Sequence, residues 1–257
     1  MFKQKVSILI NTKHSREELL NEFEFLLGSL CKTGQILKKY ESPYIENNEI
    51  VSFQRTHEST SLSKKYHNEY VNAHWNNLEK WCNSKLMVKR VATYPSCIRL
   101  SCKCKNPGFY VLFTHTFNDL SPVQCGECRR SVPLYKIKGL TSDELYEILS
   151  WETNYKACDD LQLGCRVGEQ WATKQMSDAF SQLSKQGIAN CISIKRATGA
   201  PAYYYLFNYK NISKKVDRSR KCPSCKGDWL INDNAEKFHN FLCKKCNLIS
   251  SFTSNSK

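Results

Sequence analysis

Two cysteine pairs near the C-terminus constrain the fold more than any other feature of this 257-residue sequence. Cys222 with Cys225 and Cys243 with Cys246 both have the C-x-x-C spacing, and 17 residues separate the pairs. A C-x-x-C turn aims two thiolates at one ion, so two such turns supply the four tetrahedral ligands of a zinc ribbon. Because so short a segment buries little apolar surface, the metal must contribute much of its folding free energy.

A second cysteine cluster lies in the middle of the chain. Cys102 and Cys104 form a C-x-C pair, and Cys125 and Cys128 follow after 20 residues with the C-x-x-C spacing. The segment between the pairs, FYVLFTHTF, alternates as a ribbon strand does. We therefore predict a second zinc site from these four residues.

This central site has alternatives. Cys97 or His115 could replace one ligand, and Cys125 with Cys128 could form a redox pair, although the thioredoxin-like βαβ context is missing. Sites made of four thiolates leave no open coordination position, which favours two structural Zn²⁺ ions over a catalytic one. Fourteen cysteines without a secretory signal indicate a reducing, cytoplasmic location.

The chain is basic, with a formal net charge of +14. Such a charge favours polyanions, above all RNA or DNA, although abundant lysine can simply keep a protein in solution. The positive charge is spread over most of the sequence, and only 141–165 is clearly acidic. No run of residues is apolar enough to suggest a membrane span.

The first hundred residues have the pattern of a small α/β module. The predicted elements are strands at 2–10 and 50–55 and helices at 15–32 and 65–82. Ser15 and Glu18 have the spacing of a capping box at the start of the first helix.

The stretch after the central cysteines predicts two helices and a hairpin. The helices are expected at 142–160 and 168–186, with Gly187 as a C-cap. The runs Cys191–Arg196 and Tyr203–Tyr209, joined by the turn segment ATGAPA, predict a β-hairpin. A helix followed by a basic hairpin is typical of winged-helix modules, and an ordinary α+β core is the alternative.

These patterns together predict a multi-module α+β protein. The modules are an N-terminal α/β module at 1–95, a first zinc-ribbon-like module at 96–138, a helical plus β-hairpin module at 139–210, and a C-terminal zinc ribbon at 211–257.

Several stretches resemble an uncharacterised bacterial family of zinc-ribbon-containing proteins for which nucleic-acid binding has been suggested. The stretches are LLGSLCKTGQIL, CKC, SPVQCGECRRSVPLY, WETNYKACDDLQLGCRVGE, LSKQGIANCISIKRATGAPAYYYLFNY and RKCPSCKGDWL. The first hundred residues match this family less well. The resemblance implies metal ligation by the same eight cysteines, and its suggested function rests on the ribbon itself.

We therefore expect a zinc-binding, nucleic-acid-binding protein rather than an enzyme, because no catalytic motif is recognisable in the sequence. A protein-interaction module, such as an immunity-type or regulatory partner, is the alternative. The residues expected to contact phosphates are Lys185, Lys195, Arg196, Lys214, Lys215, Arg218, Arg220, Lys244 and Lys245.

Overall fold

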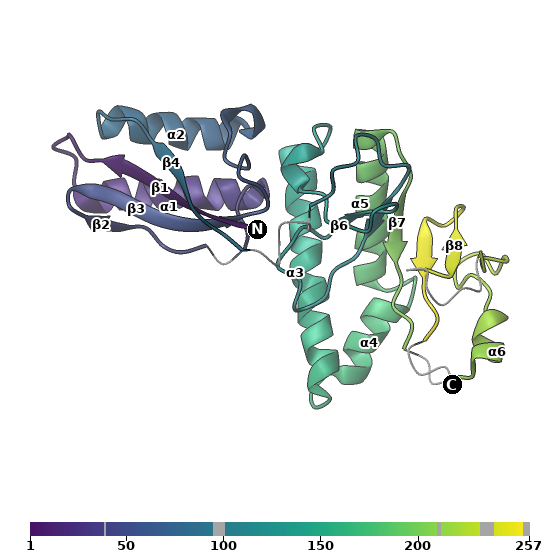
Figure 1. Cartoon of the computed structure of the whole chain (residues 1–257). Coiled ribbons are helices and arrows are strands. Elements are labelled where there is room, and N and C mark those ends of the chain that lie inside the picture. The colour runs from purple at the N-terminus through teal and green to yellow at the C-terminus, as the bar shows by residue number, and fades with distance from the viewer. Residues whose placement is uncertain (39, 95–100, 210–211, 232–238, 254–257) are drawn as a thin grey trace. The chain divides into compact units, whose positions relative to one another are not determined.

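The computed structural model describes residues 1–38, 40–94, 101–209, 212–231 and 239–253 (Figure 1). The chain divides into two compact units. The first unit is Met1–Lys103 with Asp119–Ser121 and Arg130–Lys138, and the second is Cys104–Asn118, Pro122–Arg129 and Gly139–Lys257. Both units combine helices with strands, as predicted for an α+β protein. The finer division into four modules stays a prediction.

The first unit contains one antiparallel sheet and two helices. Its elements are β1 (Phe2–Leu9), α1 (Arg16–Lys32), β2 (Tyr44–Glu46), β3 (Glu49–Thr56), a 3₁₀ turn (Lys64–Tyr66), α2 (Glu69–Trp81), β4 (Met87–Thr93) and a second 3₁₀ turn (Leu134–Lys136). The sheet has the order β2-β3-β1-β4. The chain order β-α-β-β-α-β with this strand order is that of the ferredoxin-like, split βαβ topology.

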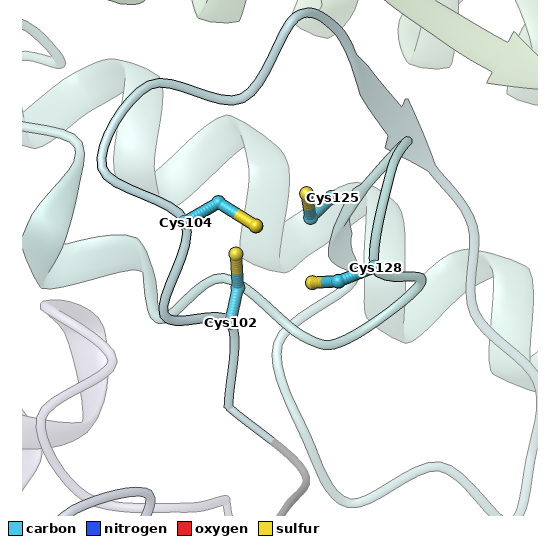
Figure 2. A group of neighbouring side chains, drawn as sticks. All are labelled: Cys102, Cys104, Cys125 and Cys128. Atoms are coloured by element: carbon cyan, nitrogen blue, oxygen red, sulfur yellow. The ribbon is translucent and has the colours of Figure 1, made fainter.

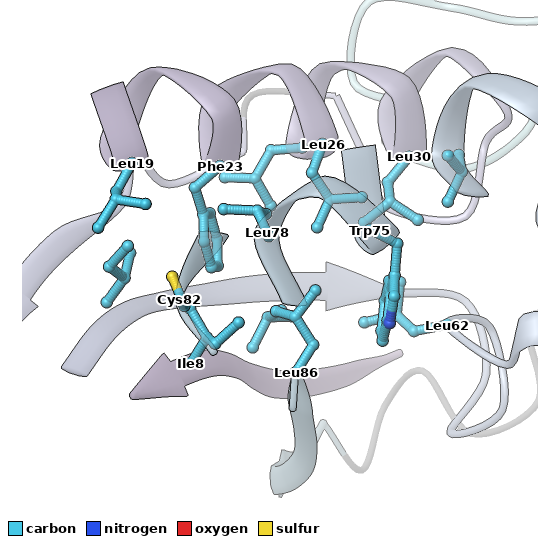
Figure 3. Packing of buried hydrophobic residues seen from close by; sticks show 14 of the residues in the cluster. Ile8, Leu19, Phe23, Leu26, Leu30, Leu62, Trp75, Leu78, Cys82 and Leu86 are labelled. Carbon is cyan, nitrogen blue, oxygen red and sulfur yellow. The ribbon is translucent and has the colours of Figure 1, made fainter. Parts of the chain in front are cut away.

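The core of this unit forms where both helices pack on the sheet (Figure 3). In α1, the buried Leu19, Phe23 and Leu26 recur at helical spacing and meet Leu78 of α2 and Ile8 of β1. The predicted capping box begins α1: the Glu18 backbone N–H donates to Ser15 Oγ, and the Glu18 carboxylate accepts from the Ser15 N–H.

Two strands of the first unit were missed in the sequence. β4 is exposed along its whole length, so it lacks the alternation of buried and exposed residues that marks a half-buried strand. β2 has only three residues and turns into β3 through Asn47 and Asn48, both with positive φ. The expected strand at 50–55 and helix at 65–82 are present as β3 and α2, and α2 begins later, at Glu69.

The second unit contains a five-stranded mixed sheet with helices. Its elements are β5 (Tyr110–Leu112), β6 (Val123–Cys125), α3 (Ser142–Gly164), α4 (Glu169–Ser177), α5 (Gln182–Thr198), β7 (Ala202–Tyr205), α6 (Lys214–Arg218), β8 (Phe241–Cys243) and β9 (Leu248–Ser250). The strand order is β6-β5-β7-β9-β8. The inner strands β5, β7 and β9 are parallel, and the outer strands β6 and β8 run antiparallel to their neighbours. A single strand, β7, therefore joins two hairpins into one sheet.

Helix α5 packs against β7 through a close approach at Gly187. Tyr204 of β7 is fully buried, and its ring forms an edge contact with Trp151 of α3. A Cβ on Gly187 would lie well inside 3.0 Å of the Tyr204 ring and 2.9 Å from Trp151 Nε1. Only glycine lets the α5 backbone come this near to the two rings.

The predicted winged-helix arrangement is wrong, because residues 191–196 belong to α5 rather than to a hairpin. Ser181 caps this helix at its start, and Gly199, with a φ of 73°, ends it, so Gly187 lies inside the helix. The burial of Leu183, Cys191 and Ile194 follows helical spacing. The run Tyr203–Tyr209 contributes β7, which pairs in parallel with β5 and β9. In the described part of the chain, none of the helices has the length and apolarity to cross a bilayer.

Candidate metal centres

The C-terminal cysteines come together at one end of β8 and β9. Cys243 is the last residue of β8, Cys246 lies in the turn to β9, and Cys222 and Cys225 follow α6. The four sulfurs all lie within 4.8 Å of one another. Four residues that are distant in sequence therefore form the single group that their spacing predicts.

The sulfur spacing fits a tetrahedral ion and not a disulfide. Cys225 Sγ and Cys243 Sγ are 3.6 Å apart. Four sulfurs at about 2.3 Å from a zinc ion would be about 3.8 Å from each other, whereas a disulfide bond is about 2.05 Å long. None of the cysteines among the described residues forms a disulfide bond. The four thiols thus fit a Zn²⁺ ion, and would hold it as a structural centre.

Backbone N–H groups of the two C-x-x-C turns donate hydrogen bonds to these sulfurs. A hydrogen bond from the Gly227 N–H lowers the pKa of Cys225 to about 7. Burial raises the pKa of Cys243 to about 12, although the Cys246 N–H donates to its sulfur. Such donors stabilise thiolate over thiol, and thiolate is the form that binds metal.

The three C-x-x-C turns share one backbone feature. The residue directly after the second cysteine has a positive φ in each: 60° at Arg129, 60° at Lys226 and 52° at Asn247. In two of the turns, its N–H donates to the carbonyl of the first cysteine at 2.9 Å, from Arg129 to Cys125 and from Lys226 to Cys222. The recurrence of this strained conformation indicates that the turns are built for the same task.

The central cysteines form the second group (Figure 2). The side chains of Cys102, Cys104, Cys125 and Cys128 converge with their sulfurs facing a common centre, all within 4.8 Å of one another. Cys125 ends β6, and the Cys102 N–H donates to the carbonyl of Ser131 at 2.7 Å. Four converging thiols are a metal-binding arrangement rather than a two-cysteine redox pair.

Two alternatives for this site have different outcomes. His115 is not part of the group, while Cys97 lies outside the described residues.

Two further cysteines lie near each other in the sequence but outside both groups. Cys158 is buried in α3 and Cys165 ends that helix with a positive φ. Neither joins a ligand cluster, and the two cysteine groups are the only thiol-rich metal clusters in the described part of the chain.

Both cysteine groups lie at the same end of the sheet of the second unit. Cys125 pairs with Tyr110, at the start of β5, and Cys243 pairs with Leu248, at the start of β9. Because β5 and β9 are parallel, their starts lie at one edge. Cys125 and Cys243 are four strand spacings apart along this edge, about 19 Å.

Exposed cations lie inside and beside the cysteine turns at this edge. Lys105 follows Cys104, Arg129 follows Cys128, and Lys244 and Lys245 lie between Cys243 and Cys246. A zinc ion with four thiolates carries a formal charge of about −2. These side chains would therefore offset the charge of a zinc ion bound at each group, and they also give the edge a positive surface.

The residues predicted to contact phosphates differ in their surroundings. Lys185, Lys195 and Arg196 are exposed on α5, although Arg196 pairs with Glu144 and donates to the Gly139 carbonyl. In α6, Lys215 and Arg218 are exposed and Lys214 lies over the Phe252 ring.

Arg220 has a structural environment that sequence reasoning did not reveal. Its Nε donates to the fully buried Asp217 at 2.9 Å, and its guanidinium lies 4.8 Å from the Trp229 ring centre and 4.2 Å from that of Phe241. Asp217 also accepts from Asn208 and from the Thr253 N–H. This buried ion pair holds α6, the segment after β7 and the segment around β8 together.

Comparison with known proteins gives three family matches, each described as a domain of unknown function. They cover residues 1–92 (DUF8589), 104–207 (DUF2310) and 211–256 (DUF8594). No solved structure matches the chain.

Two uncharacterised proteins of Haemophilus influenzae are 35% identical to this chain over 150 residues, or 58% of its length. The matched region is 58% of the first relative, so the chain covers less than two thirds of that protein, and 74% of the second. The chain therefore belongs to the same family of uncharacterised bacterial proteins as this second relative.

Proposed function

We propose that this protein is a zinc-stabilised nucleic-acid-binding protein without a catalytic metal. The observation that carries the proposal is the placement of two four-cysteine groups at one edge of a single sheet, with exposed Lys and Arg in and beside their turns. The ion at each centre would fix the conformation of the turns that carry these cations.

The metal part of the proposal rests on the donor set. Four thiolates prefer zinc among the common intracellular ions, and they leave no position for a substrate or an activated water. Cys102, Cys104, Cys125 and Cys128 would hold one ion. Cys222, Cys225, Cys243 and Cys246 would hold the other. In both sites the ion would supply folding free energy, because it would join cysteines from separate segments of the chain.

The nucleic-acid part rests on charge that remains after the metal is counted. Residues 211–257 contain ten Lys and Arg against four Asp and Glu, so this segment stays positive even with about −2 from its zinc centre. Of the residues expected to contact phosphates, Lys244 and Lys245 lie at the shared edge, and Arg220 contributes by holding the ribbon in place.

A salt titration tests this proposal. The affinity of the zinc-loaded protein for fluorescein-labelled single-stranded and duplex oligonucleotides is measured by anisotropy at increasing salt. Replacing Lys105, Lys244 and Lys245 by alanine should lower the slope of log affinity against log salt by about 2 for a single strand if all three contact phosphates.

A matched control removes the same charge elsewhere. The triple alanine variant of Lys13, Lys32 and Lys80, which are exposed in the first unit, should leave the slope nearly unchanged. Absence of binding at low salt, or equal effects of the two triple variants, would contradict the proposal.

A protein partner is the second candidate, favoured by exposed apolar residues around α4. Leu163, Val167 and Trp171 are 51%, 78% and 57% exposed. Exposed apolar side chains mark protein contacts more often than nucleic-acid contacts. A stoichiometric partner recovered from nuclease-treated lysate, and lost with Val167→Ser and Trp171→Ser, would favour this function.

A further inference from the structure

A cavity of about 380 Å³ lies beside the C-terminal cysteine group. Its walls come from α4, from the segment that follows β7, and from the first C-x-x-C turn of that group. Its lining includes Phe207, Tyr209, Lys221 and Lys226. A cavity of this size suits a small ligand or a single unit of a polymer.

One wall of the cavity is aromatic and held in place. The rings of Phe207 and Tyr209 are stacked, with centroids 5.8 Å apart and an interplanar angle of 21°. The Phe207 N–H donates to the Met176 carbonyl of α4 at 3.2 Å. The side chain of Asn208, the residue between Phe207 and Tyr209 in the sequence, donates to the buried Asp217. Tyr209 is nevertheless 51% exposed, so one ring of an anchored pair faces outward.

Two lysines also line the cavity. Lys221 and Lys226, on either side of the turn between Cys222 and Cys225, are both exposed. Lys226 donates to the Pro223 carbonyl at 2.9 Å, and Lys221 pairs with Asp228, whose side chain is 90% exposed. Exposed pairs of this kind contribute little stability, so both ammonium groups can turn to an anion at low cost.

We propose that this cavity holds one nucleotide of a single-stranded nucleic acid. The base stacks on Tyr209, and the phosphate lies between Lys221 and Lys226. A stacked base in a duplex has no free face for such a wall, so the site selects single strands. The inference rests on the proposed nucleic-acid binding and adds to it the form of the ligand.

The test compares variants of the full, zinc-loaded chain in their affinity for a labelled oligothymidylate and for a duplex of equal length. Tyr209→Ala should weaken single-strand binding by about fivefold or more, whereas Tyr209→Phe keeps the ring and should bind as the wild type does. Tyr146→Ala is the matched control, because Tyr146 is 57% exposed on α3, away from the cavity lining. Thermal unfolding of all three variants should match the wild type.

The remaining outcomes separate the two proposals. If oligonucleotides bind but Tyr209→Ala behaves as Tyr146→Ala does, or if single strands and duplexes bind equally, the nucleotide site is wrong and the proposed function stands. If oligonucleotides fail to bind while uridine monophosphate binds in a Tyr209-dependent way, the occupant is a free nucleotide and both proposals fall in their stated form.

Discussion

Replacement of Gly187 by alanine should destabilise the second unit, although the same change inside a helix is ordinarily favourable. Alanine in place of an exposed helical glycine gains about 0.5–1 kcal/mol. At Gly187 the added methyl group would instead overlap the Tyr204 ring and lie 2.9 Å from Trp151 Nε1, and both rings are fully buried. Overpacking of this kind costs about 1–3 kcal/mol. Since two large buried rings can shift little, we expect the upper part of that range and a net loss of about 1–2 kcal/mol.

Gly28→Ala is the matched control. Gly28 lies inside α1, and a Cβ there would meet nothing within 4 Å, so this variant should gain about 0.5–1 kcal/mol. Calorimetric melting of the zinc-loaded protein distinguishes the two, since 1 kcal/mol corresponds to roughly 2–4 °C in a unit of this size. A Gly187→Ala protein that melts at or above the wild-type temperature would refute the packing of α5 against β7, and with it the helical assignment of 182–198.

Three further predictions concern buried charge and bound metal. Burial lowers the pKa of His57 from 6.5 to about 4, so between these pH values the unfolded chain takes up a proton that the folded protein does not. The first unit should therefore lose about 3 kcal/mol of stability as the pH falls from 6.5 to 4. His57→Gln should flatten the acid side of the stability profile measured by urea unfolding. Arg220→Met should destabilise the second unit by about 3–5 kcal/mol because Asp217 is left buried and uncompensated, whereas the exposed Arg218→Met should change it by less than about 0.5 kcal/mol in the same denaturant titration. Chelation by EDTA, or acidification that protonates the thiolates, should unfold the ribbon around Cys243, seen as lost amide protection at 241–250; full protection without metal would contradict a structural role.

The cysteine groups could be predicted from the sequence because ligand spacing is local chemistry. A C-x-x-C turn carries its own geometry, and two turns need only a flexible connection to meet around one ion. The same holds for the start of α1, where Ser15 and Glu18 satisfy each other within one helical turn. What sequence reasoning left out at the cysteine turns was the positive φ after each second cysteine, at Arg129, Lys226 and Asn247, none of which is glycine.

The middle of the chain was misread because its local pattern is ambiguous. The sequence CISIK alternates as a strand does, yet Cys191 and Ile194 together with Leu183 also form one helical stripe. The choice depends on Tyr204 and Trp151, which bury that stripe and leave room only for Gly187. Such non-local packing overrides local preference and is not visible in a window of the sequence.

Strand pairing and side-chain contacts between distant segments also could not be predicted from the sequence. Nothing in either cysteine cluster indicates that β7 joins both hairpins in one sheet, or that the two clusters lie at the same edge of it. The pairing of Arg220 with Asp217 likewise depends on the fold, because the aromatic rings that flank Arg220 come from Trp229 and Phe241. A charge count identifies a basic segment, but not which of its cations are used to hold the protein together.

The central claim is that each group of four thiolates holds one structural zinc ion, and a metal count tests it most directly. Elemental analysis of protein purified under reducing conditions should give two zinc ions per chain, one after Cys128→Ser or Cys225→Ser, and still two after Cys165→Ser, which alters a cysteine outside both groups. A folded wild-type protein without bound metal, or a count that Cys225→Ser leaves unchanged, would contradict the account.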